Sequence, residues 1–370
     1  MHDTIVWSTP LRTRFRGLDT RDGMLIRGDA GWGELSPFWD YDDAESATWL
    51  RAAREAADTG WPAPVRDTVP VNVTVPAVEP EQARAIVLAS GGCRTAKIKV
   101  AQRLPGGDVE PLSTEQARVE AVRSAFDELL ADDDGPGSPS EPPADRTGEP
   151  ASATARRPGA RIRIDANGGW SLDEALRRLP VLDRAAGGDG RSGSTHGLEY
   201  VEQPCASVED LAAVRRAQHV PVAADESIRR AEDPLRVVRL EAADVVVLKV
   251  APLGGVRACL DLAEQVGLPV VVSSALESSV GLAAGVALAA ALPDLPHACG
   301  LATAQLLVHD VVAAPLLPVD GAIPVRRPSP DPAALARATA PRDVADRWRA
   351  RYHRLAQVLD TADAVGSAAG

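Results

Sequence analysis

The sequence predicts an α/β protein built around a closed barrel of parallel strands, with a smaller α+β domain beside it. The chain has 370 residues, more than the roughly 250 residues of a typical barrel domain. Along its middle, eight short apolar runs alternate with segments of helical spacing. Near-continuous apolar strands separated by helices indicate parallel strands buried on both faces, and eight such units point to a closed barrel.

The eight strand candidates are each rich in β-forming apolar residues and bounded by turn residues. They are Val69–Pro76, Thr95–Val100, Arg161–Asn167, Leu198–Pro204, Val220–Glu226, Val245–Val250, Pro269–Ser274 and His297–Ala302. Between them, Val208–Gln218 and Gly255–Val266 carry apolar residues at helical spacing. Ser113 and Ser171, each followed three residues later by Gln or Glu, fit capping boxes and predict two helix starts.

The ends of the chain do not follow the rhythm of the barrel, so we expect them to pack together as a second domain. We divide the chain into residues 1–66 as an N-terminal domain, 67–316 as the barrel, and 317–370 as a C-terminal segment packed against the first. Outside the barrel the sequence predicts an early strand, an aromatic loop and two helices. These are Gly23–Arg27, Gly31–Tyr41, Asp43–Ala57 and Val344–Leu359.

Two polar stretches interrupt the pattern of the barrel. Asp132–Gly159 is rich in Asp, Pro, Ser, Gly and Glu, and Gly187–Gly197 is a shorter stretch of the same kind. Such sequences bury too little apolar surface to offset the entropy cost of ordering them. We therefore expect residues 132–159 to be a disordered insertion and neither stretch to carry chemistry.

Composition excludes several classes of protein. The formal net charge of -12 argues against a nucleic-acid or anionic-membrane partner. The four cysteines are widely spaced with no CxxC pair, which is typical of free thiols in a reducing cytosol. The N-terminus has no signal-peptide pattern, and no unbroken apolar run reaches about 18 residues. We expect a cytoplasmic protein, and the sequence leaves its oligomeric state open.

The distribution of lysine suggests where proton-transfer chemistry occurs. Of the 40 basic residues, three are lysines, and all three lie in two apolar runs: Lys97 and Lys99 in one, Lys249 in the other. Arginine serves nearly as well for surface ion pairs, but its guanidinium stays charged and cannot exchange a proton. Lysine kept at two buried strand ends therefore indicates a need for a titratable amine. The alternative is chance placement of three surface lysines.

Five consecutive strand candidates end in an ionisable residue. In order along the chain these residues are Lys99, Asp165, Glu202, Asp225 and Lys249. The carboxyl ends of parallel barrel strands lie at one mouth, where such enzymes place their active sites. A single acid at a strand end is more often a loop or capping residue, but that explanation does not fit a series on five strands.

The three acids predict a metal site. Converging carboxylates repel one another unless a cation lies between them, and oxygen ligands without His or Cys suit Mg²⁺ rather than zinc. The flanking lysines then face a divalent cation and each other. We expect these neighbours to lower the lysine pKa toward working pH, as a general base requires.

The ordered motifs resemble those of the enolase superfamily, and more narrowly its muconate-lactonizing-enzyme branch. The motifs are Lys97-Ile98-Lys99, Arg163-Ile164-Asp165-Ala166-Asn167, Glu202-Gln203-Pro204, Ala224-Asp225-Glu226-Ser227 and Leu248-Lys249. Two further segments, Arg14–Glu45 and Ser273–Gly281, resemble the o-succinylbenzoate synthases of the actinobacterial type. The resemblance implies a (β/α)7β-type TIM barrel with an α+β capping domain built from the N-terminal region and the C-terminal tail.

The resemblance also implies a reaction. It is the Mg²⁺-dependent syn-dehydration of a small dicarboxylate, 2-succinyl-6-hydroxy-2,4-cyclohexadiene-1-carboxylate, to o-succinylbenzoate in menaquinone biosynthesis. Asp165, Glu202 and Asp225 would hold Mg²⁺, with Mn²⁺ as a possible substitute, and the cation would stabilise an enediolate.

The lysines take roles from the same resemblance. Lys99 would remove the α-proton and return a proton to the departing hydroxyl on the same face. Lys249 would stabilise the intermediate from the opposite face, and Lys97 would tune Lys99 by like-charge repulsion.

Several residues are predicted to support the site or bind substrate. They are Arg163, Asn167, Glu226, Ser273, Ser274 and Glu277. Arg163 shares a strand face with Asp165, so it is expected to contact substrate or a metal ligand, with a surface arginine as the alternative. The helix that follows Ser278 is expected to offer free N–H groups to the second carboxylate of the substrate, with ordinary capping as the alternative.

Trp39 and Tyr41 are predicted either to close over the site as a lid or to pack between domains.

Three other functions remain open on the sequence. An N-acylamino acid racemase or dipeptide epimerase of the same superfamily also needs lysines on both faces. A Schiff-base or pyridoxal-phosphate barrel would use one strand lysine but leaves the three carboxylates unexplained. A non-catalytic scaffold would tolerate arginine at Lys99 and Lys249.

Overall fold

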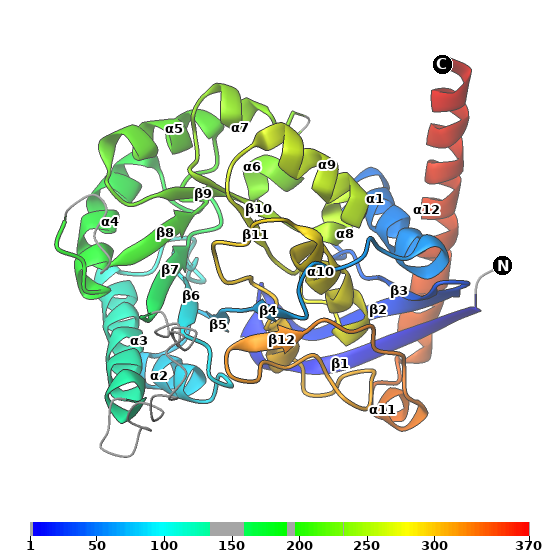
Figure 1. Cartoon of the computed structure of the whole chain (residues 1–370), viewed down its shortest axis with the longest axis horizontal. Helices are drawn as coiled ribbons and strands as arrows, with labels where there is room; N and C mark the ends of the chain where they lie inside the picture. Colours follow the sequence, from blue (N-terminus) through cyan, green and yellow to red (C-terminus); the bar gives the residue numbers. More distant parts are fainter. Residues whose placement is uncertain (1–2, 134–158, 191–196, 232, 370) are drawn as a thin grey trace, which may run out of the picture.

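The computed structural model describes residues 3–133, 159–190, 197–231 and 233–369 (Figure 1). Of the two polar stretches that we expected to lack chemistry, residues 134–158 and 191–196 lie outside this described part. The predicted disorder of the insertion therefore stays a prediction. Its first two residues, Asp132 and Asp133, belong to the end of a long helix.

The barrel is built on a seven-stranded parallel sheet, as the apolar runs predicted. Its strands, in order around the sheet, are β5 (Val73–Val75), β6 (Thr95–Lys99), β7 (Arg161–Asp165), β8 (Leu198–Glu202), β9 (Val222–Ala224), β10 (Val245–Leu248) and β11 (Val270–Val272). Nearly all of their residues are buried, because helices cover the outer face and side chains fill the interior.

The eighth predicted strand, His297–Ala302, does not form a regular strand. Instead Cys299 bridges Val71 and Gly300 bridges Ser273, both in the parallel sense, so the chain closes the gap between β5 and β11. The Gly300 N–H donates to the Val272 carbonyl at 2.8 Å. A Cβ on Gly300 would lie 2.5 Å from Ser273 Oγ, which explains why glycine is needed at this close approach.

The first predicted strand, Val69–Pro76, is divided between two sheets. Its beginning forms β4 (Thr68–Pro70), which pairs antiparallel with β12 (Ala322–Pro324), and its end forms β5 in the barrel. The C-terminal segment thus returns to the base of the barrel before it reaches the second domain.

The barrel helices follow the strands and lie outside the sheet. They are α2 (Pro80–Leu88), α3 (Leu112–Asp133), α4 (Leu172–Ala185), α5 (Val208–Ala217), α6 (Glu226–Arg229), α7 (Arg236–Arg239), α8 (Val250–Leu253), α9 (Val256–Val266) and α10 (Ser279–Ala291), with the 3₁₀ turn η2 (Thr303–Leu306). The capping box at Ser171 is confirmed. The one at Ser113 is wrong: α3 already begins at Leu112, so Ser113 lies inside the helix, and the Gln116 side chain bonds to Glu120 instead.

The N-terminal domain is a three-stranded antiparallel sheet with a helix packed on it. Its elements are β1 (Asp3–Phe15), β2 (Leu18–Gly28), β3 (Gly31–Leu35), α1 (Asp43–Arg54) and the π-helical turn η1 (Glu55–Thr59). The predicted early strand lies within β2, and part of the predicted aromatic loop is β3. Strand β1 was not predicted, because its residues are mostly half-exposed and form no continuous apolar run.

The C-terminal helices complete this domain. They are α11 (Pro332–Arg337) and α12 (Arg342–Ala369), of which α12 is longer than the predicted Val344–Leu359. Trp49 of α1 and Trp348 of α12 are fully buried in one apolar cluster with Met24 of β2. The two ends of the chain therefore pack together, and Figure 1 shows α12 extending past the rest of the molecule.

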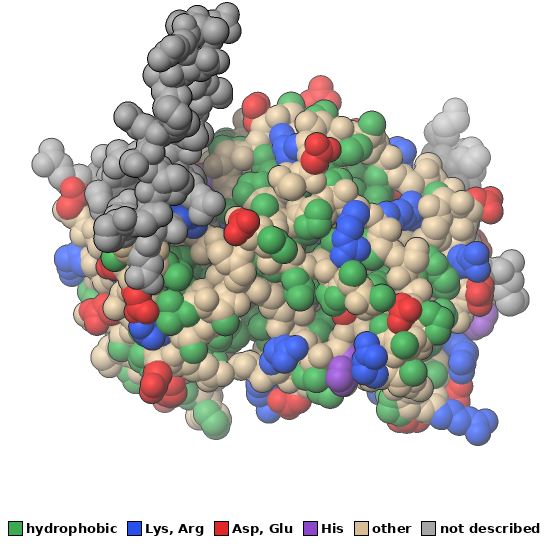
Figure 2. All heavy atoms as spheres, turned by 60° about the horizontal axis from the view of Figure 1, so that its bottom comes forward, with side chains coloured by type: hydrophobic (Ala, Val, Ile, Leu, Met, Phe, Trp, Pro, Cys, Tyr) green, Lys and Arg blue, Asp and Glu red, His purple; other side chains and the backbone are tan. Residues whose placement is uncertain are grey.

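The surface shows a mixture of charges. On the face drawn in Figure 2, acidic and basic side chains are interspersed among apolar and neutral ones. Within the residues that the structure describes, no helix has both the length and the hydropathy needed to cross a bilayer.

Candidate active site

The structure brings the five predicted strand-end residues to the same end of the barrel. Strands β6, β7 and β8 lie in register, so Lys99 is the Cα partner of Asp165, and Asp165 is the partner of Glu202. Asp225 follows β9 and Lys249 follows β10. The register, which the buried apolar residues set, therefore places lysines on both sides of three carboxylates.

Each lysine donates to one or more of the carboxylates. Lys97 Nζ lies 2.9 Å from Glu202 Oε1 and 3.2 Å from Asp165 Oδ2. Lys99 Nζ lies 2.5 Å from the same Asp165 oxygen, and Lys249 Nζ lies 2.5 Å from Asp225 Oδ2. The three carboxylates are at most 1% exposed, so these contacts are buried ion pairs.

The carboxylates differ in their electrostatic surroundings. Burial opposes ionisation of Asp165, but the ammonium groups of Lys99 and Lys97 hold its pKa well below the usual range. Asp225 is likewise buried, and Lys249 and Arg229 lower its pKa. Burial, together with the negative charge of Asp165, raises the pKa of Glu202 to about 7. Of the three carboxylates, Glu202 is thus the one whose pKa is raised.

The carboxylates around Lys97 decide the direction in which its pKa is shifted. Burial alone would lower its pKa, but the carboxylates of Glu202 and Asp165 raise it. In this arrangement Lys97 is a charged partner of the acids. The predicted lowering concerns lysines that face a bound cation, and it stays a prediction.

A cavity of about 590 Å³ opens above the cluster, between the barrel and the N-terminal domain. All three lysines line it, while the more deeply buried carboxylates do not. Four of the predicted supporting residues also line it: Asn167, Glu226, Ser273 and Ser274. The N-terminal domain contributes the β1–β2 turn from Arg14 to Gly17, together with Phe38, Tyr41 and Trp49.

Asn167 and Glu226 extend the polar network beside Lys99. The Asn167 side-chain oxygen accepts from Lys99 Nζ at 2.7 Å, and its amide donates to Glu226 at 3.3 Å. Asn167 has a positive φ of 47°, a conformation that Asn tolerates better than most residues. The strand end is therefore turned so that this side chain faces the lysine.

Two predicted supporting residues lie away from the cavity. Arg163 is completely buried inside the barrel, where it pairs with Glu199 at 2.5 Å and donates to Asn72 at 3.1 Å. It contacts none of the three predicted metal ligands in these hydrogen bonds, because it lies one layer below them. Glu277 turns back to accept from the Ala275 N–H at 2.7 Å.

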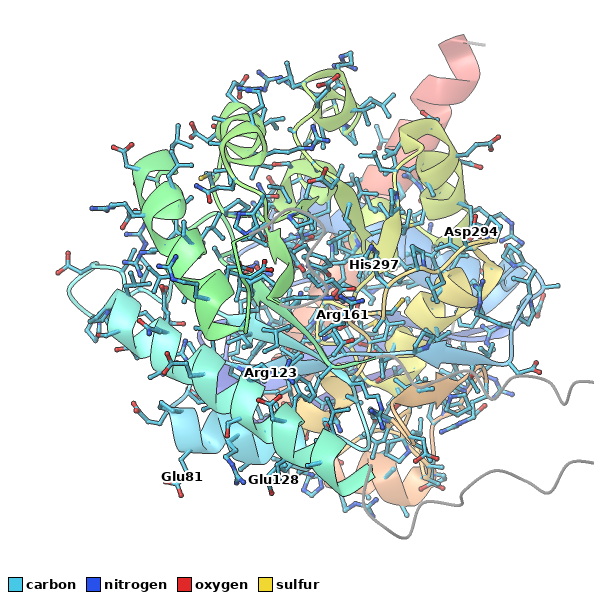
Figure 3. All side chains as sticks on the ribbon, turned by 60° about the vertical axis from the view of Figure 1, so that its left-hand side comes forward. Glu81, Arg123, Glu128, Arg161, Asp294 and His297 are labelled. Carbon is cyan, nitrogen blue, oxygen red and sulfur yellow. The ribbon has the colours of Figure 1, made fainter. Side chains whose placement is uncertain are left out.

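The layer below the site also contains His297, whose Nδ1 lies 2.9 Å from Glu199. Figure 3 shows His297 inside the ring of strands, whereas the labelled Arg123 and Glu128 lie on α3 outside it.

The sequence predicts that N–H groups at the start of α10 are free to bind a substrate carboxylate. The structure shows that they are already occupied. The N–H groups of Ser278 and Gly281 both donate to Glu34, each at 3.2 Å. The Ser279 N–H donates to Asp310. Acidic side chains of the chain itself thus occupy this helix terminus.

The two aromatic residues predicted as a lid lie on different sides. Tyr41 is buried and lines the cavity, and its hydroxyl accepts from Arg16 and Arg229, both at 3.0 Å. Trp39 instead packs on Trp348 of α12, with ring centroids 4.8 Å apart, and does not line the cavity.

The family of the chain follows from comparison with known proteins. Residues 149–330 match the family described as Enolase C-terminal domain-like, and residues 6–57 match Enolase N-terminal domain-like. The o-succinylbenzoate synthase of Thermobifida fusca (strain YX) is 59% identical over 321 residues, which are 87% of this chain and 86% of that protein. The o-succinylbenzoate synthase of Mycolicibacterium smegmatis is 47% identical, over 93% of this chain and 92% of that protein. The chain belongs to the o-succinylbenzoate synthase family.

Solved structures of other enolase-superfamily enzymes share the fold. A muconate lactonizing enzyme from Pseudomonas fluorescens, complexed with muconolactone, aligns with a TM-score of 0.68 at 20% identity, over 91% of this chain and 97% of that one. The L-Ala-D/L-Glu epimerase of Bacillus subtilis aligns with a TM-score of 0.66 at 21% identity, over 89% and 96%. The predicted enolase-superfamily barrel with a capping domain is confirmed.

Enzymes of this superfamily use a divalent metal ion. In the described ranges, no three Asp, Glu, His or Cys side chains surround one point closely enough to hold a metal as they stand. Lysine ammonium groups contact all three acids instead. The donor chemistry nevertheless fits a hard cation, because three buried carboxylates lie at the ends of adjacent strands. A bound cation would replace lysine contacts at these oxygens.

Two buried residues hold the backbone around Lys99 in this o-succinylbenzoate synthase fold. They were not predicted from the sequence. Arg118 of α3 donates to the Lys99 carbonyl at 2.9 Å, and Glu115 accepts from the Ala101 N–H at 2.7 Å. Both contact the backbone from outside the barrel. No local pattern identifies them, because an arginine and a glutamate on a helix usually face solvent.

Arg16 and Arg229 at the cavity wall were also missed. Arg229 follows Asp225 by four residues and pairs with it at 2.9 Å, a helical spacing that could have been noticed.

Proposed function

We propose that the chain dehydrates 2-succinyl-6-hydroxy-2,4-cyclohexadiene-1-carboxylate to o-succinylbenzoate, as a step of menaquinone biosynthesis. The observation that carries the proposal is the placement of lysines from β6 and from the end of β10 around three buried carboxylates beneath one cavity. The family relationship supports the choice of reaction, since relatives named o-succinylbenzoate synthase match over most of the chain.

In this proposal Asp165, Glu202 and Asp225 hold Mg²⁺, for which Mn²⁺ can substitute. When bound, the cation supplies positive charge that stabilises the negative charge developing on the substrate carboxylate. Exchange of lysine contacts for metal contacts leaves the ammonium groups of the lysines free to face the cavity that they line.

Lys99 is proposed as the base and then the acid. Its neutral amine takes the α-proton, and the resulting ammonium gives a proton to the hydroxyl, which leaves from the same face as water. The ring becomes aromatic, so the elimination is downhill. The Asn167 side-chain oxygen 2.7 Å from Nζ, and the Phe15 ring with its centroid 5.8 Å away, hold this lysine in place.

Lys249 is proposed to act from the other side of the cavity. Its charge offsets the negative charge of the intermediate without a proton transfer. Lys97 sits beside Glu202 and Asp165, where it fixes the orientation of both acids and repels the charged form of Lys99.

The direct test is a Mg²⁺-dependent assay that follows conversion of conjugated-diene absorbance into aromatic absorbance. We expect turnover by the purified chain with Mg²⁺ and with Mn²⁺. Failure to form the aromatic product with either ion would refute the proposal.

A second assay addresses racemase or epimerase activity. The likeness to the Bacillus subtilis epimerase, at 21% identity, concerns the fold alone. In D₂O with N-succinyl amino acids, rapid α-deuterium exchange and racemisation without any dehydration of the diene would favour that activity. We expect dehydration to be the faster reaction.

A cytoplasmic location is part of the proposal. It is supported by the four cysteines, all of which are buried free thiols.

A further inference from the structure

The loop between β11 and α10 forms one wall of the cavity. Ser273, Ser274, Ala275 and Leu276 all line it, and Leu276 is only 2% exposed. Leu276 has a φ of 65°, in the left-handed region that a bulky side chain rarely adopts. Such a conformation is strained and persists only where the surroundings impose it. The contacts that impose it come from the N-terminal domain.

Arg21 of β2 holds the carbonyl side of this loop. Its side chain is 2% exposed, and Nε donates to the Leu276 carbonyl at 3.0 Å while Nη2 reaches the Ala275 carbonyl at 3.4 Å. Nη2 also donates to the Ser36 carbonyl. The same guanidinium lies over the Phe38 ring, 4.5 Å from its centroid, and Phe38 also lines the cavity. One side chain therefore fixes two apolar residues of the cavity wall.

Glu34 of β3 holds the amide side of the loop. Its carboxylate is 5% exposed and accepts from the Ser278 and Gly281 N–H groups at 3.2 Å each, and from the Ser278 hydroxyl. A Cβ on Gly281 would lie 2.8 Å from the Glu34 carboxyl carbon, so the glycine allows this approach. The contacts join residues 244 and 247 positions apart in the chain.

Neither Arg21 nor Glu34 lines the cavity itself. We propose that these two residues are positioning residues, which hold Leu276 and Phe38 as an apolar wall that selects a substrate with an apolar ring or methylene arm beside its carboxylate. This inference rests on the proposed function for the identity of the substrate. It also explains why two segments that carry the family resemblance, one in each domain, contact each other here.

The first test measures order in the loop and does not depend on catalysis. Amide hydrogen exchange of a peptide covering residues 273–281 is compared in Arg21→Met, Glu34→Gln and Asp310→Asn variants of the full chain. Asp310 accepts from the Ser279 N–H and hydroxyl at the same helix start, but it does not contact residues 273–277 in these bonds. We expect faster exchange in residues 275–278 of the first two variants, and not in the control.

The second test measures selection of the substrate. We expect Arg21→Met and Leu276→Ala each to raise KM for the diene by about tenfold while kcat changes by less than about threefold, because the wall binds ground state and transition state alike. Arg21→Lys, which keeps a charged donor group in place of the guanidinium fork, should recover part of the loss. In the double variant Arg21→Met/Leu276→Ala, the rise in KM should be smaller than the product of the two single effects, because Arg21 acts in part through Leu276.

The outcomes separate a positioning role from a general structural one. Multiplicative effects in the double variant, an equal rise of KM in Asp310→Asn, or unchanged exchange in Arg21→Met would each overturn the inference. Absence of dehydration by the wild-type chain would refute the proposed function instead. The exchange experiment would then still decide whether Arg21 and Glu34 hold the loop.

Discussion

Arg118 of α3 donates a hydrogen bond across 2.9 Å to the backbone carbonyl of Lys99, from the outside of the barrel. The same guanidinium binds the Val78 carbonyl at 2.7 Å and pairs with Glu110 at 2.8 Å, and it is 2% exposed. The proposed base thus stands at a strand end that is fixed from both sides: by Arg118 behind the backbone, and by Asp165 and Asn167 at its ammonium group.

We predict that Arg118→Met lowers kcat by about tenfold with little change in KM, because a small displacement of Lys99 affects proton transfer more than binding. It should also destabilise the fold by about 3–5 kcal/mol, since Glu110 would remain buried without its partner. Steady-state kinetics and urea unfolding measure the two effects. Arg123→Met on the same helix, whose partner Asp127 is largely exposed, is the matched control and should change neither. A rise in KM alone would contradict the role given to Arg118.

Replacement of either proposed catalytic lysine by arginine should nearly abolish dehydration. Guanidinium cannot release a proton at working pH, so Lys99→Arg removes the base, with an expected loss in kcat of about a thousandfold or more. Lys249→Arg keeps the charge but widens a group that already lies 2.5 Å from Asp225. Single-turnover measurements with the diene check both variants, and near-normal turnover in either would support a non-catalytic scaffold.

The strand ends could be predicted from the sequence because each is marked locally. An apolar run followed by Lys99, Asp165 or Glu202 identifies both the strand and the side of the barrel on which its polar residue lies. The same logic failed for Arg163. Period-two alternation gives the face of a strand but not the depth, and two residues correspond to roughly 7 Å along it. Arg163 therefore shares the interior with Asp165 but lies beneath the site.

The support for the site could not be predicted, because it depends on long-range contacts. Glu34 caps a helix 244 residues further along the chain, and nothing near Ser278 in the sequence signals that its amides are occupied. The direction of the pKa shift at Lys97 also depends on distances of about 3 Å to Glu202 and Asp165 that no pattern supplies.

The buried carboxyl of Glu34 should make stability depend on pH. Burial raises its pKa to about 7, from an ordinary value of 4.5. Between those values the folded state binds more protons than the unfolded state, so stability falls as pH rises from about 4.5 to 7 and is level above that. Over this range the contribution of Glu34 is about 3 kcal/mol. Glu34→Gln removes this titrating group and with it the fall in stability. The free energy of unfolding of the variant minus that of wild type should therefore be larger at pH 8 than at pH 5. Urea unfolding at both values measures this, and an equal difference at the two pH values would contradict it.

Metal removal should affect both activity and stability. If Asp165, Glu202 and Asp225 hold the cation, EDTA should abolish dehydration, and Mg²⁺ or Mn²⁺ should restore it. Because a cation that binds only the folded state stabilises it, Mg²⁺ at a hundredfold excess over its Kd should add about 2.7 kcal/mol to the free energy of unfolding.

In Asp225→Asn this gain in stability from Mg²⁺ should shrink, because one charged ligand is lost. Lys249 also loses its 2.5 Å partner. Thermal unfolding with and without Mg²⁺, in wild type and Asp225→Asn, measures the difference. Equal stabilisation of the two proteins by Mg²⁺ would place the cation elsewhere, and retention of full activity in EDTA would remove the metal from the mechanism.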